Sequence, residues 1–192
     1  MKKITFVTGN AGKLRELQRM TRDTPLNFEM ETMNLDLPEI QGDPLAVAEN
    51  KCKSAAEIVG GAVLVEDTSL CFNALGGLPG VYVKWFLDGV GNKGLNNLLA
   101  AYEDKTATAQ CIFAFSKGPG EPILTFKGQT EGLIVDARGP PSSFGWDPIF
   151  QPSEGEGKTY AEMDVAEKDK VSDRGKGFRE VVTYLNTTLD SI

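Results

Sequence analysis

The order of apolar and polar residues near the N-terminus predicts a strand, a tight loop and a helix in direct succession. Lys3–Thr8 alternates apolar and β-branched residues, which is typical of a strand. Gly9–Gly12 interrupts that alternation, and Leu14 and Leu17 then recur at helical spacing, with Met20 as a further candidate. This segment is therefore predicted to form a strand–loop–helix (βα) unit.

The next segments predict a strand, a loop, a helix and a short strand, over Phe28–Met33, Leu35–Pro44, Pro44–Val59 and Ala62–Val65. Proline is favoured at the first position of a helix, as Pro44 would be, and the pair Gly60-Gly61 is expected to stop it. The apolar face of this helix is predicted to comprise Leu45, Ala48, Cys52, Ala55, Ala56 and Val59. The buried strand is expected to end abruptly at Glu66.

Strands dominate the second half of the chain. The expected elements are helical patterns at Val83–Leu87 and Leu95–Tyr102, strands at Thr106–Ser116 and Ile123–Thr130 with Leu133–Val135 as a candidate continuation, and a final helix at Ser172–Leu189. Because helices and strands alternate early and strands cluster later, the fold class is predicted to be α/β with a mixed sheet.

Length and composition narrow the class of protein. A chain of 192 residues fits one domain or two small lobes, and 41% hydrophobic with 24% charged residues is ordinary for a globular protein. No apolar stretch is long enough to span a bilayer or to form a signal peptide, so a cytoplasmic protein without membrane contact is expected. The net charge of −7 argues against a nucleic-acid binder.

The chain contains no histidine, and this limits its chemistry. Histidine-based general base catalysis and histidine-ligated zinc are excluded. The three cysteines stand at no metal-ligand spacing and are interpreted as reduced, buried thiols. Any metal must bind to oxygen ligands, which indicates magnesium, manganese or calcium.

The loop that contains Thr8, Gly9, Asn10, Ala11, Gly12 and Lys13 is a candidate phosphate site. A strand that enters a helix through a glycine loop presents backbone N–H groups and a positive dipole end. The loop is not a Walker A motif, since the glycine spacing is too short and no Ser or Thr follows Lys13. The alternative is a tight βα turn with a surface lysine.

Two acidic segments are candidate cation ligands. Glu66 and Asp67 follow a buried strand, and alternation along a strand sends them to opposite sides, so that one can serve a site and the other the structure. The alternative is an Asp cap with a salt-bridged neighbour. Glu39, in a proline-containing loop, matters only if folding brings it near Asp67.

An aromatic segment, Ser143–Pro148, is a candidate surface for a nucleotide base. Phe144 and Trp146 flank Gly145 and can offer stacking faces, while Asp147 can accept hydrogen bonds. The alternative is that Trp146 anchors the core. Scattered basic residues could hold phosphates, although most lysines are simply solvated; they are Lys51, Lys84, Lys168, Lys170, Arg174 and Lys176.

Taken together, the segments resemble the inosine triphosphate pyrophosphatases, and their sequences look most like the eukaryotic branch of that family. The matching segments follow one another along nearly the whole chain: Thr8-Gly9-Asn10 with Lys13, Leu37–Glu39 with Gln41-Gly42, Val65–Thr68, Leu75–Gly80, Lys84–Phe86, Phe144–Pro148, Tyr160–Met163 and Glu167-Lys168. No single segment is decisive, but the ordered combination is highly specific.

The resemblance implies a single domain over residues 1–192, with two lobes around a long mixed β-sheet and flanking helices, usually as a homodimer. It implies Mg²⁺-dependent hydrolysis of ITP, dITP and XTP to the monophosphate and pyrophosphate, with Mn²⁺ as a possible substitute. Carried onto this chain, the resemblance implies that the phosphates are bound by Thr8 to Lys13, Lys51 and Lys84. It implies that Glu39 and Asp67 bind the metal, that Asp67 is also the base for the attacking water, and that Thr68 contacts the substrate. The residues implied to bind the purine are Phe144, Gly145, Trp146, Asp147, Lys168, Asp173 and Arg174.

One position departs from the family pattern. The family carries Ser-His-Arg where this chain reads Ser172-Asp173-Arg174. An ionised aspartate only accepts hydrogen bonds, whereas histidine can donate, so Asp173 puts the choice of base in question. The alternatives are a broader-specificity nucleoside triphosphate pyrophosphatase, a nucleotide-binding module without turnover, or an Asp173 that caps the last helix and leaves the pocket.

Overall fold

The structure, a computed structural model, describes residues 3–22 and 24–188 and shows a mixed α/β protein. The five α-helices within these residues are α1 (Ala11–Arg22), α2 (Pro44–Val59), α3 (Val83–Asn97), α4 (Val165–Val171) and α5 (Asp173–Thr188). The strands are β1 (Lys3–Val7), β2 (Glu29–Met33), β3 (Val63–Phe72), β4 (Pro79–Gly80), β5 (Thr106–Ser116), β6 (Ile123–Ile134) and β7 (Phe150–Pro152). Short 3₁₀ turns lie at Asn73–Leu75 and Asp147–Ile149.

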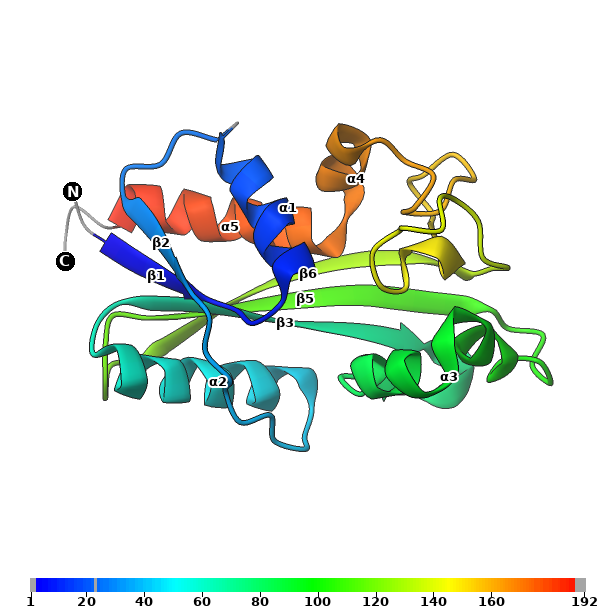
Figure 1. Ribbon diagram of the computed structural model, residues 1–192, viewed down its shortest axis with the longest axis horizontal. Coiled ribbons are helices and arrows are strands. Elements are labelled where there is room, and N and C mark those ends of the chain that lie inside the picture. The colour runs from blue at the N-terminus through cyan, green and yellow to red at the C-terminus, as the bar shows by residue number, and fades with distance from the viewer. Residues whose placement is uncertain (1–2, 23, 189–192) are drawn as a thin grey trace. The chain divides into compact units, whose positions relative to one another are not determined.

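Among the described residues, seven strands form one sheet in the order β2-β1-β3-β5-β6-β7, and β4 pairs with β3 beside this path (Figure 1). β1 runs parallel to both β2 and β3, whereas β4 is antiparallel to β3 and β7 is antiparallel to β6. The predicted α/β fold with a long mixed sheet is therefore confirmed. No helix in the described part of the chain has the length and apolar character needed to cross a membrane.

The chain divides into two compact units, and the division passes through β3, β5 and β6. The described residues of the first unit lie within 3–67, 112–127 and 177–188. Within it, α1 and α5 lie on one side of the strands and α2 on the other (Figure 1). In its core, the face of α2 that carries small residues packs against the strands. The residues of this core are Val7, Ala48, Cys52, Ala55, Ala56, Val63, Val65, Ile112 and Ala114.

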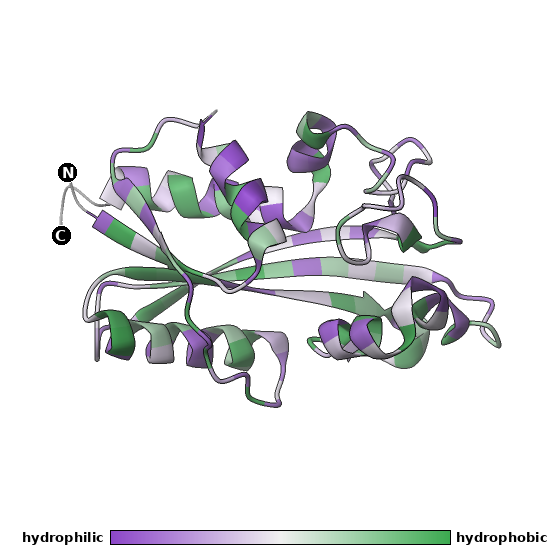
Figure 2. Ribbon diagram, in the orientation of Figure 1, coloured by the Kyte–Doolittle hydropathy of each residue, from purple (hydrophilic) through white to green (hydrophobic). Residues whose placement is uncertain are grey.

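The second unit comprises residues 68–111 and 128–176 and has its own core. α3 contributes Val83 and Leu95, and the end of β3 contributes Leu70 and Phe72. Phe150 and Tyr160 complete the aromatic part of this core. Hydrophobic and hydrophilic residues are interspersed along α3, as expected for a helix with one face on a core (Figure 2).

Helix α2 forms where the sequence predicts it, because its end signals are local. The side chain of Asp43 accepts the N–H groups of Leu45 and Ala46, and Gly60 closes the helix at φ 71°. Its buried face includes Val47, and Leu45 is 44% exposed, so the placement of Leu45 on the apolar face is wrong.

The expectation that the strand after Ala62 ends at Glu66 is wrong, since β3 continues to Phe72. Glu66 and Asp67 lie inside the strand and are 3% and 9% exposed. Each carboxylate pairs with a lysine, which compensates for its removal from water. Likewise, β6 runs without interruption from Ile123 to Ile134, so Leu133–Val135 is mainly part of that strand.

The final helix is confirmed within one residue at its start, whereas the helical patterns in the middle of the chain need correction. Val83–Leu87 and the first residues of the Leu95–Tyr102 pattern lie in α3, which is interrupted at Gly91 (φ 65°) and ends at Asn97, so the rest of the second pattern is not α-helical. The final helix begins at Asp173, and a separate helix, α4, precedes it. Extended backbone at Ser172 (ψ 151°) separates the two helices. The predicted end at Leu189 lies outside the described residues.

Candidate active site

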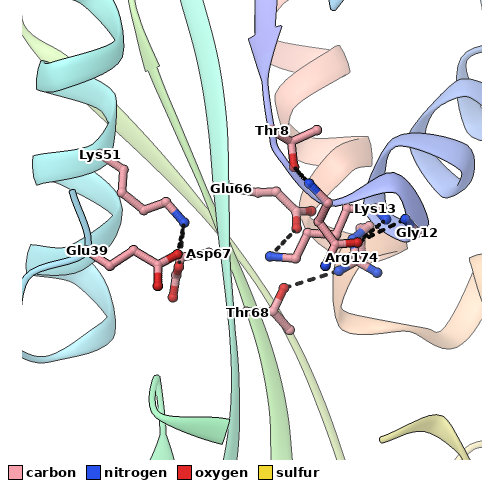
Figure 3. A network of polar contacts seen from close by, with 10 residues as sticks. Thr8, Gly12, Lys13, Glu39, Lys51, Glu66, Asp67, Thr68 and Arg174 are labelled. Carbon is pink, nitrogen blue, oxygen red and sulfur yellow. Dashed lines mark hydrogen bonds and ion pairs between the residues drawn. The ribbon is translucent and has the colours of Figure 1, made fainter. Parts of the chain in front are cut away.

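In the first unit, the carboxylates of Glu39 and Asp67 contact the same ammonium group. The Nζ atom of Lys51, on α2, lies 3.0 Å from Asp67 Oδ1 and 3.3 Å from Glu39 Oε1 (Figure 3). Glu39 comes from the loop before α2, and Asp67 from β3. The two carboxylates thus share one cationic partner, and they are the side chains here that could bind a divalent ion.

The environment of Lys51 keeps it charged. Burial lowers the pKa of Lys51, but the carboxylates of Asp67 and Glu39 raise it by more, so the pKa lies above its usual value of 10.5. The side chains of Lys51 and Asp67 are only 13% and 11% exposed, which strengthens their attraction. Lys51 is therefore an ammonium group at neutral pH, next to two carboxylates.

The side chain of Glu66 lies on the other side of β3 from that of Asp67. Its Oε1 lies 2.8 Å from the Nζ of Lys13, and Figure 3 shows this pair across the strand from Lys51, Glu39 and Asp67. The parallel register pairs Phe6 with Leu64, so Glu66 lies beside the point where β1 gives way to its loop. Glu66 was predicted to lie at the end of its own strand; it lies inside β3 instead, next to the end of the neighbouring strand β1.

The loop after β1 is organised by Asn10. Its Oδ1 accepts the N–H of Gly12 at 2.9 Å and that of Lys13 at 3.1 Å, which makes Asn10 the N-cap of α1. Thr8 Oγ1 in turn accepts the N–H of Asn10. The expected row of unbonded N–H groups is thus wrong for Gly12 and Lys13, because Asn10 already satisfies them. The helix dipole and the Lys13 ammonium remain as attractions for an anion.

The donor set of this region suits a hard cation that uses substrate oxygens as well. Within the described residues, no group of three or more His, Cys, Asp or Glu side chains is placed to hold a metal ion. Magnesium is commonly bound through one or two carboxylates, with waters and phosphate oxygens completing its coordination. Glu39 and Asp67 fit that pattern.

In the second unit, Lys168 and Asp147 form a buried ion pair between two aromatic rings. Lys168 Nζ lies 2.5 Å from Asp147 Oδ2, and both residues are 7% exposed. The same ammonium lies 5.3 Å from the ring centroid of Tyr160 and 5.7 Å from that of Phe144. Cation–π attraction and the carboxylate thus fix one lysine in place.

Trp146 contributes to the core of this unit. Its ring meets Phe150 edge-on at 5.6 Å and lies 6.0 Å from the ring of Tyr160. The residue is half-buried and packs on the buried cluster, as the core-anchor alternative predicts. Gly145 has φ 55°, a conformation that favours glycine, and it turns the chain between the two aromatic residues.

The segment Ser172–Arg174 also lies in the second unit. Ser172 Oγ accepts the N–H of Gly175 at 3.1 Å and so caps α5. The alternative in which Asp173 caps this helix is therefore wrong. Asp173 is 3% exposed and is hydrogen-bonded to the hydroxyl of Tyr160. Arg174 donates to Thr68 Oγ1 at 3.2 Å.

The remaining candidates differ in what surrounds them. Lys84 is exposed on α3, with its ammonium 5.5 Å from the ring centroid of Trp85. Tyr160 belongs to a segment that matches the family pattern but has no role predicted from its residue type, yet it contacts both Lys168 and Asp173. No local signal in the sequence could have found it, because its partners come from other segments.

Comparisons with known proteins agree with the architecture. Residues 4–184 match the Ham1 family. A protein of Fusarium vanettenii named inosine triphosphate pyrophosphatase is 52% identical over 95% of each chain, and one of the same name from Pyricularia oryzae is 55% identical over 95% of this chain and 93% of that protein. A HAM1 protein of Coxiella burnetii superposes with a TM-score of 0.84 and 28% identity, over 97% of this chain and all (100%) of that one. The chain belongs to the Ham1 family.

Proposed function

We propose that this chain hydrolyses non-standard purine nucleoside triphosphates (ITP, dITP and XTP) to the monophosphate and pyrophosphate, and so removes them from the nucleotide pool. The observation that carries the proposal is the Glu39–Lys51–Asp67 arrangement, in which two carboxylates and one ammonium lie together. A polyanionic substrate with a divalent cation needs both charge types in one place. The names of the relatives supply the substrate class.

In the proposed reaction, Asp67 orients a water molecule and accepts its proton as the water oxygen attacks the α-phosphorus. The bond from that phosphorus to the bridging α–β oxygen breaks, and pyrophosphate leaves with the electron pair. Lys13 and Lys51 attract the phosphate oxygens as compact point charges, without the fork geometry of arginine. Glu39 and Asp67 would hold Mg²⁺, which when bound would supply positive charge against the charge that develops on the leaving group.

At the base end, Lys168 is the proposed donor to the 6-oxo group that inosine and xanthosine share. Asp147 and the Phe144 and Tyr160 rings hold its ammonium, which carries three donors in all. The comparisons do not favour a broader-specificity pyrophosphatase. A binding module without turnover is less suited to the site, since a pure binder needs no carboxylate positioned to take a proton from water.

The finer assignments belong to the same proposal. We propose that Mg²⁺ is required, with Mn²⁺ as a substitute, because both are hard cations that accept carboxylate and phosphate oxygens. Cys52, Cys71 and Cys111 form no disulfide with one another, in keeping with a reducing cytoplasm. A homodimer would cover exposed apolar side chains such as Trp85 (64%) and Val90 (55%).

The test is to incubate the protein with ITP and excess Mg²⁺ and to assay pyrophosphate and orthophosphate separately. We expect stoichiometric IMP and pyrophosphate, without orthophosphate, and faster turnover of ITP and XTP than of GTP or dUTP. Orthophosphate as the first product, or tight ITP binding without hydrolysis, would contradict the proposal.

A further inference from the structure

We propose that Asp173 is a positioning residue that holds the Tyr160 hydroxyl, that Tyr160 in turn holds Lys168, and that Asp173 does not itself contact the purine. The proposal rests on the function proposed above, and it concerns how the base end is built. It opposes the simpler view in which the carboxylate of Asp173 selects the base directly.

The first observation is a reciprocal pair of hydrogen bonds. The Tyr160 hydroxyl donates to Asp173 Oδ1 at 3.3 Å and accepts the backbone N–H of Asp173 at 3.4 Å. Both residues are 3% exposed. Ser172 caps α5, and the Asp173 side chain accepts the tyrosine hydroxyl. One oxygen of the Asp173 carboxylate is thus engaged with the tyrosine rather than with a ligand.

The second observation is that the Tyr160 ring is fixed from several sides. Phe150 meets it edge-on at a centroid distance of 5.0 Å, and Trp146 lies 6.0 Å away. Burial, and next the negative charge of Asp173, raises the pKa of Tyr160 well above its usual value. The hydroxyl therefore keeps its proton at neutral pH and can donate to the carboxylate.

The third observation connects this pair to Lys168. The lysine ammonium lies 5.3 Å from the Tyr160 ring centroid and is paired with Asp147. Any tilt of the ring moves the face on which this ammonium rests. Loss of the Tyr160–Asp173 pair should therefore weaken Lys168's contact with every 6-oxopurine to the same degree. A residue that selects the base would instead change the preference among purines.

The experiment compares Tyr160→Phe, Asp173→Ala and the double variant by pyrophosphate release from ITP, XTP and GTP. We expect each single variant to raise KM roughly ten-fold for all three substrates, the size of one net hydrogen bond, with kcat little changed. The double variant should be no worse than either single one, because both remove the same interaction. Asp173→Asn, which keeps an acceptor for the hydroxyl, should restore most of the affinity. Tyr102→Phe, at a 44% exposed tyrosine, is the matched control.

A second readout does not depend on turnover. Trp85→Phe leaves Trp146 as the one tryptophan in the chain. In that background, the wavelength of maximal Trp146 fluorescence should shift equally in Tyr160→Phe and Asp173→Ala and no further in the double variant. Equal shifts support the proposal, and additive shifts overturn it. A several-fold change in the ITP-to-GTP preference in Asp173→Ala, absent in Tyr160→Phe, also overturns it. A wild-type protein that releases no pyrophosphate would contradict the proposed function, and the emission experiment would still decide this inference.

Discussion

At the scale of single residues, the candidate site depends on charge balance. Glu39 and Asp67 each place a negative charge against the ammonium of Lys51, which offsets both. A cation that enters must compete with that ammonium, while a triphosphate gives the ammonium a new partner. Metal and substrate are therefore expected to bind in a mutually dependent way.

Replacing Lys51 tests this balance. Lys51→Met should destabilise the protein by about 1–3 kcal/mol at neutral pH, because two nearby carboxylates lose their shared cation. The folded pKa of Lys51 is raised, so its contribution is complete below 10.5 and is lost as pH rises through the folded value. Urea unfolding from about pH 9 to about pH 12 should show a flatter decline in the variant than in the wild type.

The control for that prediction is Lys53→Met, at an exposed position on the same helix. It should leave both the free energy of unfolding and its alkaline decline unchanged. Equal declines in wild type and Lys51→Met would contradict the ion-pair interpretation.

Glu39 is expected to act mainly through the metal. Glu39→Gln keeps the size of the side chain and removes one negative ligand, so the Mg²⁺ concentration for half-maximal activity should rise about ten-fold or more, with a smaller fall in the maximal rate. A Mg²⁺ titration of ITP turnover measures both quantities. Asp36→Asn, an exposed acid in the same loop, should behave like the wild type. An unchanged Mg²⁺ requirement in Glu39→Gln would remove Glu39 from the metal site.

Residue patterns in the sequence predicted some of this arrangement. Strand alternation placed Glu66 and Asp67 on opposite sides of one strand, as the structure has them. Tyr160 was missed, because its importance comes from Asp173 and Lys168, which reach it only through tertiary packing. The N-cap bonds of Asn10 were also missed, although Asn directly before a helix is a known cap signal.

At the scale of elements, local signals predicted helices better than strand ends. The bounds of α2 follow from Asp43, Pro44 and Gly60, all of which act within one turn. The length of β3 could not be predicted in this way, since Lys13 and Lys51 compensate its acids from distant segments. The helix α4 was missed because a run rich in charged residues lacks a strong apolar period, although Asp164 and Glu167 form a capping box.

One helix-to-loop contact supports the aromatic segment. Asn92, on α3, donates from Nδ2 to the carbonyl of Gly145 at 3.1 Å. Asn92→Ala should loosen Phe144 and raise KM for ITP about three- to ten-fold, while the free energy of unfolding falls by about 1 kcal/mol. Steady-state kinetics and urea unfolding measure the two effects. Asn97→Ala, an exposed position on the same helix, is the control. A stability loss without any change in KM would mean that the contact serves folding alone.

At the scale of the whole molecule, the family assignment rests on ordered motifs rather than on elements. Segments from Thr8 to Lys168 match in sequence order, and the family match spans residues 4–184. Composition alone indicated only an acidic globular chain. A net charge of −7 is compatible with a triphosphate substrate because the ammonium groups of Lys13, Lys51 and Lys168 are each held in a fixed position by a neighbouring carboxylate.

The central claim is that Asp67 activates water for attack on the α-phosphorus of a purine nucleoside triphosphate. Hydrolysis of ITP in ¹⁸O-labelled water, followed by mass spectrometry of both products, tests it most directly. We predict label in the phosphate of IMP and none in pyrophosphate, with turnover at least about 100-fold slower in Asp67→Asn. Label in pyrophosphate, or full activity in Asp67→Asn, would contradict the account.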